Sequence, residues 1–157
     1  MATDPSTWKL PRLRVDRDGL WYHEDQEVTH EGILATLREG LRHDAEGHYL
    51  QIGPVRVPVE VDDAPFVVIR AEDDGDDGLA VILNDGSREA LRPETLRLGP
   101  GEVPYATVKE GRFQARFTRP AAYQLMQRLE DDPDSGGAAL VLGPRRWVIP
   151  RAGLGPP

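Results

Sequence analysis

Short apolar segments that alternate with polar residues, separated by turn signals, open the chain. Arg12–Val15 and Leu20–His23 flank an Asp-Arg-Asp-Gly sequence, and its Asp-Gly pair favours the positive φ of a tight hairpin turn. Thr29 is the expected N-cap of a helix that follows. The apolar residues after it have the spacing of one helix face: Ile33, Leu34, Leu37 and Leu41. The first pattern is therefore a hairpin followed by a helix.

Strand patterns continue from residue 49 into the middle of the chain. Tyr49–Ile52 and Val55–Val61 form a second hairpin around a Gly-Pro turn. Phe66–Ala71 and Leu79–Leu83 then flank an acidic tip at Glu72–Gly78, and an Asn-Asp-Gly turn leads into one more β segment. The middle of the chain is thus predicted to be rich in β structure.

The last third repeats the pattern of the first. Tyr105–Val108 and Arg112–Phe117 form a hairpin around Lys-Glu-Gly, and Thr118 caps a second helix that has Pro120 in its first turn. The predicted apolar stripe of this helix is Ala122, Leu125, Met126 and Leu129. Six further positions recur at a constant offset of 90: Leu50, Ile52, Gly53, Pro54, Arg56 and Val59 with Leu140, Leu142, Gly143, Pro144, Arg146 and Ile149.

These repeats predict an α+β fold built from two similar hairpin-helix-hairpin units that arose by internal duplication, with a β-rich middle between them. The expected division is a flexible tail at 1–11, an N-terminal repeat at 12–61, a β-rich C-terminal domain at 62–150 that contains the second repeat, and a flexible tail at 151–157. Repeats of this size bury little surface alone, so we expect an extensive interface between them, which is a common place for a ligand.

The net charge of the chain and its distribution limit the kinds of partner that the protein can bind. The 157 residues carry a formal net charge of −8, and residues 60–89 alone hold ten acids against two bases, whereas residues 90–157 have a small excess of Arg. An acidic chain is a poor binder of long nucleic acid, which draws its affinity from Lys and Arg along the phosphates. The chain has no Cys, and its apolar runs are far shorter than a membrane helix, so we expect a cytoplasmic protein with neither a membrane nor a long nucleic acid as its partner.

Catalytic signatures are absent from the sequence: it has no phosphate-binding glycine loop, nucleophile elbow or zinc-protease motif. We therefore expect no catalytic residue, cofactor or metal. His43, Asp44 and His48 suggest a metal-dependent phosphohydrolase as the least favoured alternative. A metal site needs at least three converging ligands, and these residues straddle a predicted helix end and turn. In the acidic tip, Gly75 occupies a position where a calcium loop would have a ligand.

A small anionic ligand suits the remaining chemistry better. Trp21 and His23 alternate onto one strand face, either as core residues or as an aromatic shelf with an imidazole donor for a planar ring. Arg56 and Arg119 are candidates for holding phosphate, and Arg119 opposes the dipole of its own helix. The full set of candidate ligand-binding residues is Trp21, His23, Arg56, Asp62, Asp63, Tyr105 and Arg119.

Two functions follow from these residues. The first is a non-enzymatic module that binds a small nucleotide-like or phosphorylated ligand at the interface of its two parts. The alternative is a protein-interaction adaptor that presents the β-rich middle and the acidic tip, with Asp73, Asp74, Asp76 and Asp77, to a basic protein partner.

Several of these segments also carry a family resemblance. The sequence Asp18-Gly19-Leu20-Trp21-Tyr22-His23, the block Val61-Asp62-Asp63-Ala64-Pro65-Phe66, the pair Pro104-Tyr105 and the run Arg119-Pro120-Ala121-Ala122-Tyr123 resemble the bacterial domain-of-unknown-function family 1285 from about Leu10 to Ile149. The resemblance implies a duplicated α+β core whose C-terminal part is similar to pleckstrin-homology folds. It also implies a ligand site where the two parts meet and a role in signal transduction.

Overall fold

A computed structural model describes residues 10–151 of the protein, and these form two compact units. The first unit ends at Asp63 and the second begins at Ala64. Most of the predicted tails, 1–11 and 151–157, lies outside the described residues. Each unit is treated by itself below.

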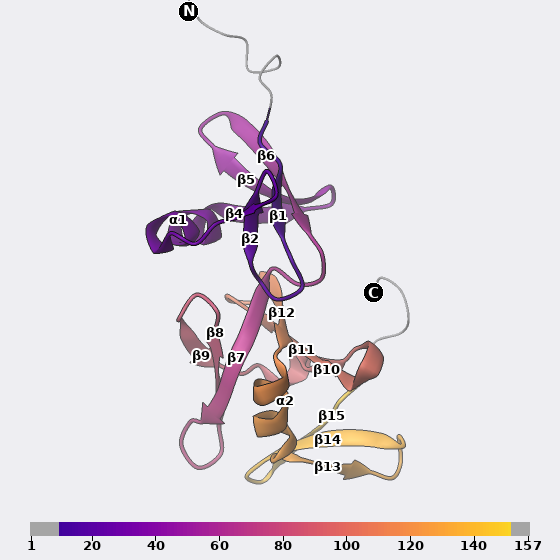
Figure 1. The fold of residues 1–157 in the computed structure, drawn as a ribbon. Helices are drawn as coiled ribbons and strands as arrows, with labels where there is room; N and C mark the ends of the chain where they lie inside the picture. The colour runs from indigo at the N-terminus through magenta and orange to yellow at the C-terminus, as the bar shows by residue number, and fades with distance from the viewer. Residues whose placement is uncertain (1–9, 152–157) are drawn as a thin grey trace, which may run out of the picture. The chain divides into compact units, whose positions relative to one another are not determined.

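The first unit is a six-stranded sheet with one helix (Figure 1). Its elements are β1 (Leu13–Val15), β2 (Trp21–His23), β3 (Gln26–Glu27), α1 (Glu31–Gly40), β4 (Leu41–Asp44), β5 (Gly47–Ile52) and β6 (Val55–Val61). The strand order is β3-β2-β1-β6-β5-β4. β1 and β6 pair in parallel, and every other neighbouring pair in this sheet is antiparallel.

The second unit contains a six-stranded sheet, a helix and a smaller sheet (Figure 1). The large sheet is formed by β7 (Phe66–Asp73), β8 (Leu79–Leu83), β9 (Arg88–Ala90), β10 (Arg97–Leu98), β11 (Pro104–Val108) and β12 (Phe113–Phe117), with short 3-10 turns η2 (Pro93–Thr95) and η3 (Pro100–Glu102). The helix α2 (Arg119–Met126) follows. Then β13 (Leu129–Asp132), β14 (Gly137–Leu142) and β15 (Arg145–Val148) form a three-stranded antiparallel sheet.

Both large sheets have the same topology. The strand order of the second large sheet is β10-β11-β12-β7-β8-β9. Its first and last strands along the chain, β7 and β12, pair in parallel at the centre of the sheet, as β1 and β6 do in the first unit. Each sheet thus consists of two antiparallel three-stranded meanders, joined by this central parallel pair. The prediction of an α+β fold with two similar units is therefore confirmed. The strand order that repeats, β1–β6 against β7–β12, differs from the repeat that the sequence suggested around the two helices.

The order of elements around the two helices also recurs, with two differences from the predicted hairpin-helix-hairpin. After each helix comes a three-stranded meander rather than a hairpin, β4–β5–β6 in one case and β13–β14–β15 in the other. Leu41 and Leu129, predicted to lie on the helices, instead begin β4 and β13. Each pairs with a leucine on the next strand, Leu50 and Leu140, and such cross-strand contacts stabilise a strand where the local helical spacing alone would extend the helix.

The N-cap predicted from the sequence is found in one of the two helices, α2. Thr118 caps α2, and its side chain accepts a hydrogen bond from the amide of Ala121. The predicted cap Thr29 is wrong, because His30 holds that position in α1, with Nδ1 accepting from the amide of Ile33 at 3.3 Å. Met126, predicted in the buried stripe of α2, is 56% exposed.

The repeated Gly-Pro turns provide a matched test of packing. Gly53 and Gly143 both have positive φ, 56° and 59°. A Cβ at Gly53 would meet nothing within 4 Å, whereas a Cβ at Gly143 would fall onto the carboxylate of Asp77, in the tip between β7 and β8. We expect Gly53→Ala to cost about 1 kcal/mol of unfolding free energy from the left-handed backbone alone.

Gly143→Ala is expected to cost more than Gly53→Ala, because the methyl group also displaces Asp77. Urea titration of both variants measures the difference, and Asp77→Ala in the Gly143→Ala background should remove it. Equal costs for the two glycine variants would show that the carboxylate moves aside freely.

Candidate functional site

Trp21 and His23 lie on β2, but their surroundings differ. Trp21 is 1% exposed, pairs in register with Val15, and belongs to the core of the first unit. Its side chain is therefore a core residue, the first of the two roles predicted for it, and is not open to stack on a ligand. His23, at the end of the strand and opposite Leu13, is exposed.

Arg56 already has a dense set of partners. Its guanidinium donates to both carboxylate oxygens of Asp44, at 2.7 and 2.9 Å, and lies 3.4 Å from Glu46. It also stacks over the ring of Tyr49, 3.7 Å from the ring centre. A two-point contact to a carboxylate is the geometry with which Arg holds phosphate, so Asp44 occupies the place that a ligand would need.

The Asp44 carboxylate carries the electrostatic signature of this contact. Hydrogen bonds from Arg56 first, and from the backbone of Glu46 next, lower the pKa of Asp44 from 3.8 to about 2. Because the folded pKa is lowered, the ionised form stabilises the fold above pH 3.8, and this contribution is lost as the pH falls from 3.8 to about 2.

A carboxyl titration by NMR is expected to give a midpoint of about 2 for Asp44. Arg56→Gln should move that midpoint up toward 3.8, since the main hydrogen-bond donor is then gone. An unchanged midpoint in the variant would show that Arg56 is not the cause.

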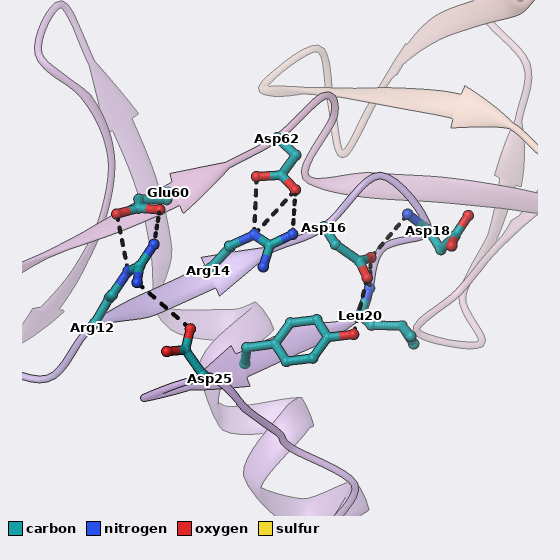
Figure 2. A network of polar contacts seen from close by, with 9 residues as sticks. Arg12, Arg14, Asp16, Asp18, Leu20, Asp25, Glu60 and Asp62 are labelled. Atoms are coloured by element: carbon teal, nitrogen blue, oxygen red, sulfur yellow. Dashed lines mark hydrogen bonds and ion pairs between the residues drawn. The ribbon is translucent and has the colours of Figure 1, made fainter.

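Asp62 is also engaged, in a network of ion pairs along β1 and β6. Figure 2 shows Arg14 directed at Asp62, with Nη2 of Arg14 at 2.8 Å from the carboxylate. Beside this pair, Arg12 lies within 3.4 Å of Glu60 and 3.6 Å of Asp25. Hydrogen bonds from Arg14 lower the pKa of Asp62. Asp63, the next residue, is exposed.

The remaining two predicted residues belong to the second unit. Tyr105 on β11 is 8% exposed, and the guanidinium of Arg97 lies 5.2 Å from its ring centre. Arg119 is the first residue of α2 and is exposed. The seven predicted residues thus divide between the two units, five in the first and two in the second.

A hollow of about 410 Å³ in the first unit includes one of these residues, His23. We call it the histidine hollow. It lies where the β2–β3 hairpin meets the start of α1, and its apolar wall is formed by Leu13, Val28, Ile33 and Leu37. Its polar residues are His23, Gln26, Glu27, Thr29 and His30. An apolar wall with a few polar groups is the usual make-up of a small-molecule site.

His30 is the functional candidate that the sequence did not reveal. Its Nδ1 accepts the amide hydrogen of Ile33, so in the neutral ring the hydrogen is on Nε2, which can donate. Gly32 leaves room for this ring, because a Cβ there would come within 3.1 Å of Cε1 of His30. The only sequence signal is the position of His30 just before the apolar helix pattern, where Thr29 is the more common type of cap.

The alternative chemistries also have definite surroundings. His43 and His48 face each other across β4 and β5 with ring centres 5.5 Å apart, and burial lowers the pKa of His48. Within residues 10–151, no three His, Cys, Asp or Glu side chains gather in a way that could hold a metal ion. At the acidic tip, Asp73 pairs with Arg128 and Asp74 with Arg88.

Neither helix among the described residues is long and apolar enough to cross a membrane.

The fold and the hollow together define an α+β protein with two central sheets of one topology and a small polar-edged cavity. This fold is that of proteins in the DUF1285 family. A DUF1285 family protein from Silicibacter pomeroyi DSS-3 matches with a TM-score of 0.72 and 22% identity, over 94% of this chain and 86% of that chain. One from Shewanella baltica OS155 matches with a TM-score of 0.63 and 17% identity, over 74% of this chain and 91% of that chain.

At such identities the likeness is one of fold, and at that level the resemblance suggested by the sequence motifs is confirmed. No protein-family model matches the sequence. No curated protein matches it either.

Proposed function

We propose that the protein is a non-enzymatic cytoplasmic module that binds a small nucleotide-like or phosphorylated molecule in the histidine hollow of its first unit. The supporting observation is the combination of an apolar wall with two imidazoles, His23 and His30, at one cavity. The family resemblance adds a role in signal transduction to this proposal, with the bound molecule as the signal.

The chemistry of the hollow suits a planar ring with polar substituents. The ring lies against Leu13, Ile33 and Leu37, and Ile33 is 51% exposed, which leaves apolar surface for the ligand to cover. His30 donates from Nε2, and His23 adds a second imidazole to hold phosphate or ring oxygens. Arg56 and Asp62 do not enter this site, because Asp44 and Arg14 hold them.

The test is a titration of labelled protein with nucleoside monophosphates, cyclic dinucleotides and inorganic phosphate, followed by NMR. We expect one nucleotide class to shift the resonances of His23, His30 and Ile33 together. His30→Asn is the sharpest variant, since Asn caps a helix well and so removes the imidazole while keeping α1 intact. We expect it to weaken binding about tenfold.

His43→Gln serves as the control, because His43 is an exposed imidazole on β4 that does not line the hollow. It should bind like the unaltered protein. If no ligand in the panel shifts these resonances, or if His30→Asn binds as tightly as the His43→Gln control, the proposal is wrong.

A further inference from the structure

A second cavity, of about 480 Å³, lies in the second unit beside α2. We call it the α2 groove. Its floor is apolar, formed by Leu98, Pro104, Ala122, Met126 and Leu129. These residues come from β10, β11, α2 and β13. The groove is thus bounded by segments that are far apart in the sequence.

Part of this apolar surface is left uncovered by the described residues of the second unit. α2 buries Ala121 and Leu125 completely, and the positions next to them, Ala122 and Met126, face the groove instead. Met126 is 56% exposed and Tyr123, on the same helix, is 61% exposed. An exposed Met side chain in an apolar groove is typical of surfaces that take up another chain.

The charged residues in the described lining of the groove are three carboxylates, Glu102, Glu130 and Asp131. Arg151 contacts Glu102, and Arg146 lies 2.8 Å from Glu130, so two of the three are partly neutralised. Asp131 is exposed. A ligand with positive charge near an apolar group complements this rim, and an acidic one is repelled.

We propose that the α2 groove is a docking site for a basic amphipathic segment of another protein, which inserts an apolar side chain against Met126 and places Lys or Arg beside Asp131. This site is separate from the histidine hollow and does not depend on it. It also differs in place from the acidic tip, which lies between β7 and β8.

The test uses three short synthetic peptides of the same length. The first, the Leu-Lys peptide, contains Leu and Lys residues. The second has Glu in place of Lys, and the third has Ser in place of Leu. The chain has two methionines, Met1 and Met126, so a methyl-labelled sample reports on the groove directly. We expect the Leu-Lys peptide to shift the Met126 methyl resonance, and to bind about tenfold more tightly than the other two, with an affinity that falls as salt is added.

Variants then assign the contact to this surface. Met126→Lys and Asp131→Lys should each weaken the Leu-Lys peptide about tenfold, as followed by fluorescence anisotropy of a labelled peptide. Ile52→Lys is the matched control, because Ile52 is 58% exposed and lies in the first unit. It should bind like the unaltered protein.

Three results would overturn the proposal: no shift at Met126, equal binding of the Lys and Glu peptides, or equal binding by Met126→Lys and Ile52→Lys. Sedimentation of the protein without peptide covers a further case. Self-association that is lost in Met126→Lys would mean that a second copy of this chain covers the groove, which also contradicts the proposal.

Discussion

Trp21→Ala is expected to lower the unfolding free energy of the first unit by about 3–5 kcal/mol. The indole is 1% exposed, so truncation leaves a cavity in the core of the first unit. Hydrogen exchange of first-unit amides in increasing urea measures the loss for that unit alone, which matters in a chain with two units.

Trp21→Phe provides the comparison. Nε1 of Trp21 is buried and has no hydrogen-bond acceptor among the described residues, so Phe removes an unsatisfied donor while it keeps most of the apolar area. We expect it to cost much less than Ala. Were Trp21→Ala to leave stability unchanged and abolish ligand binding, the indole would have to be at the surface, against its observed burial.

Leu125→Ala is expected to lower the unfolding free energy of the second unit by about 2–5 kcal/mol, because Leu125 is 0% exposed on the buried face of α2. Met126→Ala, one residue further along, should change stability by less than about 0.5 kcal/mol, because Met126 faces the α2 groove and is 56% exposed. Urea denaturation monitored by far-UV circular dichroism measures both.

These two neighbours form an internal control, since they differ in burial and share the same helical turn. Similar losses for the two variants would mean that the groove is closed over Met126. In that case the docking proposal would fail as well.

Local signals predict most of the strands and fail where a long-range contact decides the structure. The hairpins around residues 16–19 and 109–111 follow from turn chemistry that involves only neighbouring residues. Leu41 and Leu129 continue a helical apolar spacing, and only their pairing with Leu50 and Leu140 shows that they begin strands. The same leucines fit both a helical spacing and a strand pairing, and the local sequence pattern shows only the helical spacing.

The same limit applies to the candidate site. His23 is found from strand alternation, but alternation alone does not tell that Trp21 is covered while His23 lies at an exposed strand end. Arg56 is a plausible phosphate ligand until β4 is known, because β4 brings Asp44 to its guanidinium. His30 is the N-cap of α1, a position that local residue preference assigns to Thr29.

The parallel pair at the centre of each large sheet has a consequence for folding. In the first unit it joins Leu13 to Val59, and in the second it joins Phe66 to Ala115, so the first strand made finds its central partner only after the last strand has been made. Such distant contacts slow folding, because the intervening chain must be ordered before they form. On the ribosome, the edge of β1 therefore stays unpaired on its inner side until β6 has emerged, and each unit completes its sheet in one late step.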